Sequence, residues 1–144
     1  MDFSTALNIS ASGLAAERTR VDLAASNLAN AESTRGPDGQ IYRRRDPVFM
    51  ATPFDEQLGA QLGTNNGEAV GVKVQQIVED QGPGKRVYSP DHPDADEEGY
   101  ITLPDVDPVH EVVNLVSAQG AYDANATAVE TLETMASKAL DIAR

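Results

Sequence analysis

Apolar residues recur every seven positions over the first part of the chain. Between residues 4 and 31 the sequence contains no proline and is rich in alanine and leucine. The repeating positions are Leu7, Leu14, Val21 and Leu28. A narrow stripe with this spacing is typical of a coiled-coil seam rather than of a helix lying on a globule. The pattern therefore predicts an N-terminal helix, within residues 1–32, that pairs with another helix.

A second helix is predicted at the other end of the chain. Asp107 followed by Pro108 is a strong start signal, because an acidic N-cap precedes a proline at the first helical position. A seam with alternating spacings of three and four follows: Leu115, Ala118, Tyr122, Asn125, Val129, Leu132, Ala136, Ala139 and Ala143. Val109, Val112, Val113 and Val116 add a second apolar face. About 36 helical residues span about 54 Å, so we expect residues 107–144 to pair with the N-terminal helix as a coiled coil.

The pattern changes to period two in the middle of the chain. Residues 33–106 contain all of the eight prolines except Pro108. Val70, Val72 and Val74 alternate with Gly71 and Lys73, as in a strand. Further strand candidates lie at 41–43, 48–50, 86–88 and 100–103, with turns at 63–67 and 82–84. This segment predicts a small, loop-rich β insertion, and the predicted fold class is α+β.

Composition favours a chain that completes its packing with neighbours. Hydrophobic residues make up 40% of the chain, but many of them are alanines, and aromatic residues make up only 5% of the chain. A core built from these 144 residues alone is therefore thin. The net charge of −12 repels phosphate backbones and argues against a nucleic-acid partner. No apolar run approaches the roughly 20 residues of a membrane span. The N-terminus lacks the pattern of a cleaved secretory signal peptide.

Residues that could carry chemistry are few. The chain has no cysteine, and neither of its two histidines has a metal-ligand spacing. No P-loop, dinucleotide or nucleophile-elbow motif occurs. We therefore predict no catalytic residue, no metal site, no cofactor and no enzymatic activity. The basic run 43–45 predicts either a solvated or salt-bridged strand or turn, or a contact with an acidic neighbour.

An acidic loop leaves one alternative open. Asp94, Asp96 and Glu98 stand at the first, third and fifth positions of a calcium-loop spacing, with Gly99 sixth and Asp105 twelfth. Pro90, Pro93 and Pro104 interrupt the helices that should flank such a loop. The segment 94–105 thus has two interpretations. One is a calcium-responsive binding module, which is the alternative to a structural subunit. The other is a solvated acidic loop that docks on a basic neighbour.

Two motifs resemble a known family. The run Ser26, Asn27, Leu28, Ala29, Asn30 and then Thr34 is similar to the signature of the bacterial flagellar axial rod and hook family. His92, Pro93, Asp94, Asp96, Glu97, Glu98, Gly99 and Tyr100 form a second motif, which resembles the proximal-rod members in particular. The resemblance covers nearly the whole chain except 54–68. Another rod or hook subunit of the same family is the neighbouring alternative.

The resemblance implies a function and a location. Its members pair their terminal helices as a coiled coil, and copies stack helically with other rod proteins to transmit torque and form part of the export channel. It implies a place in the basal body, in the periplasmic rod, after passage through the flagellar type III export apparatus without signal-peptide cleavage, and no membrane insertion. The predicted assembly residues are Leu7, Leu14, Val21, Leu28, Leu115, Tyr122, Val129 and Leu132. Asn27 and Asn30 are predicted to cap the helix end, the alternative being plain surface residues.

Overall fold

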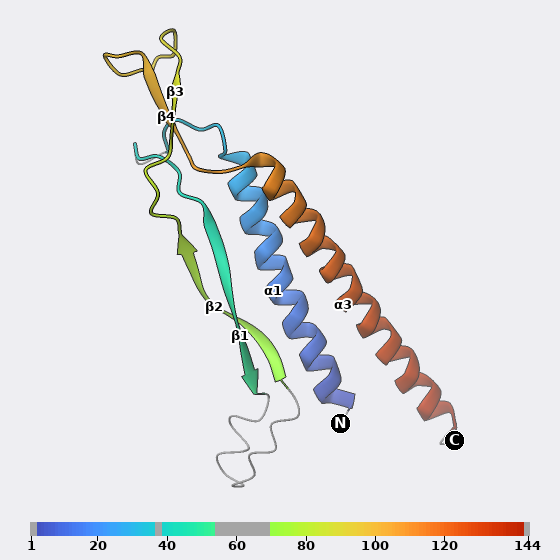
Figure 1. Cartoon of the computed structure of the whole chain (residues 1–144). Helices are drawn as coiled ribbons and strands as arrows, with labels where there is room; N and C mark the ends of the chain where they lie inside the picture. Colours follow the sequence, from blue (N-terminus) through green and yellow to red (C-terminus); the bar gives the residue numbers. More distant parts are fainter. Residues whose placement is uncertain (1–2, 37–38, 54–69, 143–144) are drawn as a thin grey trace.

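In sequence order, two small antiparallel hairpins lie between two long helices (Figure 1). The computed structural model describes residues 3–36, 39–53 and 70–142. Its elements are α1 (Phe3–Ala29), β1 (Arg45–Pro53), β2 (Val70–Glu79), β3 (Lys85–Tyr88), β4 (Tyr100–Leu103) and α3 (Pro108–Ile142). This arrangement confirms the α+β fold class. The division at residues 32 and 106 stays a prediction.

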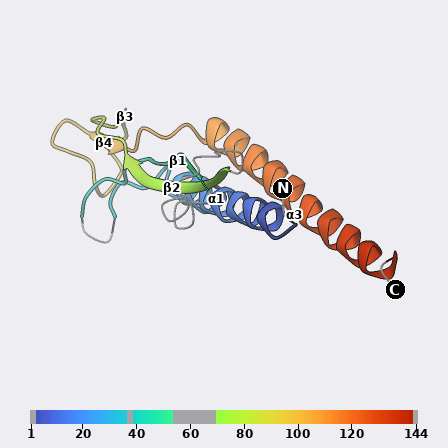
Figure 2. The same cartoon turned by 90° about the horizontal axis from the view of Figure 1, so that it is seen from below.

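The helices α1 and α3 pack side by side and run in opposite directions, so the start of α1 and the end of α3 lie at the same end of the pair (Figure 1). Small residues allow their close approach: Ala16 and Ala118 are buried, and a Cβ on Gly13 would lie 3.0 Å from Nδ2 of Asn125. The seam position Asn125 therefore faces α1. Seen from below, the C-terminal part of α3 continues past α1 (Figure 2).

The start of α3 is built as its sequence predicts. The carboxylate of Asp107 accepts a hydrogen bond from the Val109 amide at 3.0 Å, and its carbonyl accepts one from the Glu111 amide at 3.0 Å. Pro108 occupies the first helical position, where a missing N–H leaves no hydrogen bond unmade.

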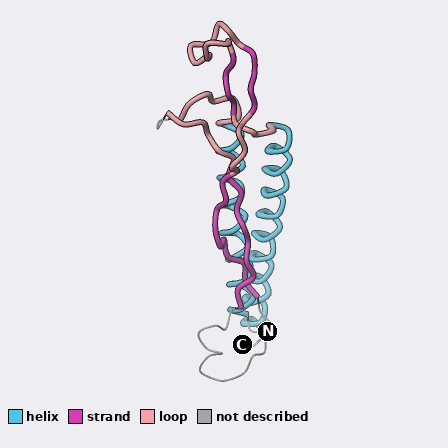
Figure 3. Tube along the Cα trace, turned by 60° about the vertical axis from the view of Figure 1, so that its left-hand side comes forward, coloured by secondary structure: helices cyan, strands magenta, loops and turns pink. Residues whose placement is uncertain are grey.

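The hairpin β1–β2 packs along α1, which also packs against α3, so α1 joins the hairpin to the helix pair (Figures 1 and 3). Ser12 of α1 fastens it, since its hydroxyl accepts a hydrogen bond from the Val72 amide at 3.0 Å and donates one to the Ile9 carbonyl at 2.7 Å. Gly71 is buried directly beneath, where an added Cβ would lie 3.1 Å from the Ser12 hydroxyl oxygen.

The hairpin β3–β4 projects beyond the ends of the helices, and we call residues 85–103 the arm (Figure 3). Tyr88 and Tyr100 pack edge to face across it, with ring centroids 5.2 Å apart. Gly84 enters β3 with a φ of 79°, a conformation that disfavours other residues.

The predicted strands at 48–50, 70–74, 86–88 and 100–103 are confirmed, but the one at 41–43 is wrong. That segment crosses the end of α1 instead of pairing with a strand, because the Tyr42 hydroxyl bonds to Ser26 and Asn27. The predicted turn at 63–67 lies outside the described residues.

Among the described residues the apolar core is thin, as the composition suggests. Its buried members are Ala16, Leu23, Ala24, Ala31, Ile101, Val106 and Ala118. Alanines dominate this set, so each contributes little buried area. Within the described part of the chain, no helix has the length and apolar character needed to cross a membrane.

Candidate functional site

A buried polar cluster joins the end of α1, the chain entering β1 and the start of α3. Asn27 is 1% exposed and sits at its centre. Its carbonyl oxygen accepts hydrogen bonds from the Arg45 amide at 3.0 Å and the Tyr42 hydroxyl at 2.9 Å. Its amide nitrogen donates to the Arg45 carbonyl at 2.9 Å and to Oε2 of Glu111 at 3.1 Å. The Asn27 side-chain amide therefore bonds to the backbone of Arg45 at the edge of β1 as a neighbouring strand would, and it also bonds to Glu111 of α3.

Glu111 brings a charge into this cluster. Its carboxylate is 1% exposed, and its second oxygen accepts a hydrogen bond from Nε of Arg44 at 2.7 Å. Arg44 also forms an ion pair with Asp46. Partial burial opposes the charge on Arg44, but its hydrogen bond to Glu111 and the nearby carboxylates outweigh this effect and raise the pKa of Arg44 above its usual value. A buried carboxylate needs such partners, since an unpaired one is strongly destabilising.

The two asparagines of the first motif differ in what they do at the end of α1. Asn30 caps the helix, because its amide donates to the Ser26 carbonyl at 2.8 Å. The Ser33 hydroxyl extends this turn by donating to the Asn30 carbonyl at 2.9 Å. The prediction of a cap is thus confirmed for Asn30 and wrong for Asn27, which points inward and bonds to segments distant in sequence.

Asp94 joins the first motif to the second across 60 residues of sequence. Its carboxylate accepts a hydrogen bond from the Thr34 hydroxyl at 2.7 Å and pairs with Arg35 at 3.2 Å. The Asp94 amide in turn donates to Nδ1 of His92 at 3.1 Å. The conformation of the turn after α1 is therefore tied to the position of the arm.

Asp96 organises the tip of the arm. Its Oδ1 accepts hydrogen bonds from the amides of Tyr100 at 2.8 Å and Glu98 at 3.0 Å, and Arg86 lies 2.7 Å from Oδ2. The bond from the Tyr100 amide, with those from Arg86 and Glu98, lowers the pKa of Asp96. Gly99 has a φ of 81°, which lets the chain turn tightly here.

Comparisons with known proteins match both ends of this architecture. The family described as "Flagella basal body rod protein" matches residues 7–37, and "Flagellar basal body rod FlgEFG protein C-terminal" matches 97–142. The flagellar basal-body rod protein FlgC of Salmonella typhimurium is 44% identical over 135 residues, covering 94% of this chain and 93% of its own. FlgC of Bacillus subtilis is 41% identical over 144 residues, covering 96% of both chains. FlgC of Yersinia enterocolitica is 39% identical over 142 residues, covering 99% and 98%.

The chain belongs to the FlgC family of flagellar basal-body rod proteins. The resemblance inferred from the two motifs is confirmed, and the chain is a structural subunit of the basal-body rod. In this FlgC-family member Thr34 and Arg35 of the first matched segment contact Asp94, which lies in the arm just before the second matched segment begins.

The calcium alternative is not favoured. Every acid of the proposed loop except Glu97 points to a cation of the same chain: Asp94 pairs with Arg35, Asp96 and Glu98 with Arg86, and Asp105 with Lys85 at 3.0 Å. Within residues 3–36, 39–53 and 70–142, no group of three or more histidine, aspartate or glutamate side chains is placed to hold a metal ion. The spacing matched a calcium loop, but the segment is the loop of a hairpin rather than a loop between two helices.

The basic run 43–45 follows the first of its two interpretations. Arg43 donates to the Asp80 carbonyl at 3.0 Å, Arg44 holds Glu111, and Arg45 pairs with Glu79 at 3.2 Å. These arginines therefore hold the FlgC-family fold together.

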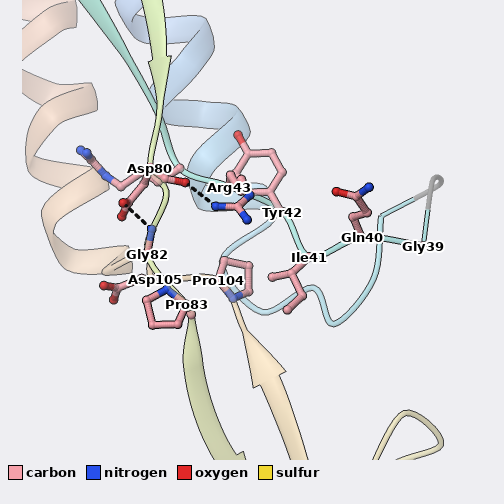
Figure 4. Close-up of a pocket in the computed structure, with 12 residues that line it drawn as sticks. Gly39, Gln40, Ile41, Tyr42, Arg43, Asp80, Gly82, Pro83, Pro104 and Asp105 are labelled. Carbon is pink, nitrogen blue, oxygen red and sulfur yellow. Dashed lines mark hydrogen bonds between the residues drawn. The ribbon is translucent and has the colours of Figure 1, made fainter.

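A pocket of about 320 Å³ lies among the linkers before β1, between β2 and β3, and after β4 (Figure 4). Ile41, Pro83 and Pro104 line its apolar part. Asp80 ties the two linkers around it, since its carbonyl accepts from Arg43 and its carboxylate accepts from the Gly82 amide at 2.9 Å (Figure 4). The contacts of Asp80 here are structural ones between neighbouring segments.

All eight predicted assembly residues are half-buried, four on α1 and four on α3: Leu7, Leu14, Val21, Leu28, Leu115, Tyr122, Val129 and Leu132. The most deeply buried side chains of the helix pair include Asn27 and Glu111 instead. The heptad pattern does not predict a buried Glu111, because a helix seam is expected to be apolar. A signal was present, since Glu111 precedes Leu115 and Ala118 at the same alternating spacing.

Proposed function

We propose that this FlgC-family chain assembles helically through its α1–α3 pair, with other copies and with other rod proteins, to form the proximal rod. In this role it transmits torque, forms part of the export channel and carries no catalytic activity. The observation that supports the proposal is the one-sided packing of α3. Its inner face lies on α1, while Val109, Val112, Val113 and Val116 are exposed.

An isolated chain leaves apolar surface in water that an assembly removes. Burying one large apolar side chain is worth about 1.5–3 kcal/mol, so a run of valines is a substantial driving force. Contacts between unlike surfaces that do not close into a ring generate a helical filament, which is the form of a rod. The thin core argues in the same direction, because neighbours supply the burial that the chain lacks.

The resemblance also supports a route out of the cell. We propose export through the flagellar type III apparatus to the periplasmic rod, without cleavage of a signal peptide. Mass spectrometry of the chain from purified basal bodies and from the cytoplasm tests this, and the two masses should agree. A shorter chain in basal bodies would contradict the proposed route.

Charge placed at the predicted assembly residues should prevent rod assembly. Leu14→Asp and Leu132→Asp each put a carboxylate at a half-buried helix position, where desolvation is costly. We expect loss of motility and of basal-body rods, measured by swimming in soft agar and electron microscopy. Ser137→Asp, at an exposed position of α3, is the matched control and should swim normally. Normal motility in both leucine variants would argue strongly against the assignment.

Deletion of the chain tests the function directly. We expect electron microscopy of purified basal bodies to show rings without a rod, and the wild-type chain to restore the rod. Complete rods and hooks in the deletion strain would refute a rod role. The position of the labelled chain in intact basal bodies distinguishes a proximal subunit from another rod or hook subunit.

A further inference from the structure

The face of α3 that points away from α1 has the features of a second helix interface. Val109, Val113 and Val116 are 72%, 60% and 64% exposed, whereas Glu111 and Ala118 on the inner face are 1% and 0% exposed. Between residues 108 and 122 the only Asp, Glu, Lys or Arg is the buried Glu111. In a chain with a net charge of −12, an exposed helix face without charge for four turns is unusual.

This face continues the spacing of a helix seam. We define the outer stripe of α3 as Val109, Val113, Val116, Gly120, Asp123 and Thr127, which alternate by four and three residues and are all exposed. A Cβ added to Gly120 would meet nothing within 4 Å. Glycine costs about 1 kcal/mol in a helix interior, and nothing in the described part of the chain packs against Gly120 to offset that cost. A closely approaching neighbour would offset it.

A matching surface lies on α1 of the same chain. We define the outer stripe of α1 as Ala15, Arg18, Asp22, Ala25 and Ala29, all exposed and alternating by three and four. Within the described part of the chain Arg18 has no ion-pair partner, whereas its neighbour Arg20 pairs with Glu17. The stripe therefore offers three alanines, the unpaired cation of Arg18 and the carboxylate of Asp22.

The two stripes complement each other when they run antiparallel. If Arg18 lies opposite Asp123, then Ala25 lies opposite Val116 and Ala29 opposite Val113, so small residues face large ones. The antiparallel sense follows from the fold, because α1 and α3 already run in opposite directions in each copy (Figure 1). Copies stacked in the same orientation keep that relation.

We propose that the outer stripe of α3 binds the outer stripe of α1 from a second copy of this chain, with Arg18 of one copy paired to Asp123 of the other. This contact rests on the proposed function, for which it specifies the two helix faces that meet and a second copy as the partner. Because the contact joins two different surfaces, it propagates from copy to copy instead of closing as a dimer.

Cysteine cross-linking in basal bodies tests the contact without background, since the chain has no cysteine of its own. Ala25→Cys and Val116→Cys are made singly and together in a strain that lacks the native chain, and purified basal bodies are oxidised. We expect a ladder of multimers on a non-reducing gel from the double variant and only monomer from each single variant. Dimers from one single variant would show that a stripe binds to itself and overturn the proposal.

Charge exchange supplies the second measurement. Arg18→Glu and Asp123→Arg should each lower the amount of chain in purified basal bodies several-fold, because like charges then face each other. The double variant, with both charges exchanged, should recover most of the loss. Both positions are exposed, so circular dichroism should show unchanged helix content in all three variants.

The outcomes separate this inference from the proposed function. Rods that contain the double-cysteine variant but yield no ladder, together with single charge variants that incorporate normally, would overturn the stripe contact and leave the rod role intact. Complete rods in the deletion strain would instead remove the proposed function on which the contact rests.

Discussion

The buried cluster around Asn27 and the arm use the same kinds of side chains in opposite surroundings. In the cluster, Arg44 and Asn27 satisfy a carboxylate that is almost wholly removed from solvent. In the arm, Arg86 pairs with Asp96 and Glu98 at the surface. Breaking a buried pair leaves an uncompensated charge, whereas an exposed pair contributes little because water screens it. The first region therefore sets how α1, β1 and α3 fit together, and the second shapes a local turn.

The largest effect should come from the buried carboxylate. Glu111→Ala leaves Arg44 partly buried without its main partner and removes one bond of Asn27, so we expect a loss of about 3–5 kcal/mol in the free energy of unfolding. Urea unfolding followed by circular dichroism measures it. Asp46→Ala, which removes the exposed partner of the same arginine, is the control and should cost at most about 1 kcal/mol. Equal losses in the two variants would erase the contrast between buried and exposed pairs.

The next effect is expected at Asn27. Asn27→Ala removes the side-chain partner of the partly buried Arg45 amide and carbonyl and one bond of the buried Glu111 carboxylate, and an orphaned buried polar group costs about 1–3 kcal/mol. Asn30→Ala removes one side-chain hydrogen bond to the Ser26 carbonyl, which still accepts the Asn30 backbone amide, and should cost about 1 kcal/mol. The same unfolding experiment compares the two, and a greater loss at Asn30 would contradict the central role given to Asn27.

A smaller and more local effect is predicted where the arm meets the turn after α1. Thr34→Val keeps the shape of the side chain but removes its hydrogen bond to Asp94, for a cost of about 1 kcal/mol or less. We expect faster amide hydrogen exchange in the segment 92–100 and an unchanged exchange rate in α3. Faster exchange throughout α3 would mean that the arm also supports the helix pair.

The smallest effect should be the acid response of the tip. Because the pKa of Asp96 is lowered in the folded chain, its contribution is complete above the ordinary aspartate pKa and is lost as the pH falls through the lower folded value. NMR of the Gly99 and Tyr100 amides on acid titration should report the change at the tip before the helices respond. In Asp96→Asn these shifts should be absent; if they persist, another group is titrating.

Much of the architecture could be predicted because it depends on local spacing. The heptad positions of both terminal segments, the cap at Asp107 and the alternation at 70–74 each depend on residues a few positions apart. The strand at 41–43 failed because Tyr42 and its neighbours are recruited by the end of α1, a tertiary contact that overrides a short β-type pattern.

The site was only half predictable. The motif residues were recognised by resemblance, but their separate roles were not, since Asn27 and Asn30 are alike in type and lie on one short run. Asn27 faces the interior, whereas Asn30 faces the helix end, and the burial and partners of each follow from that difference.

The sequence by itself determined the two terminal helices, the small β insertion between them and membership of the rod family. Only the tertiary structure decided that Asn27 and Arg44 share Glu111, that Asp94 holds the turn after α1, and which face of α3 stays uncovered. The physical reason is range: helix and strand periodicity follow from neighbouring residues, whereas partner choice across 84 positions depends on how the whole chain folds.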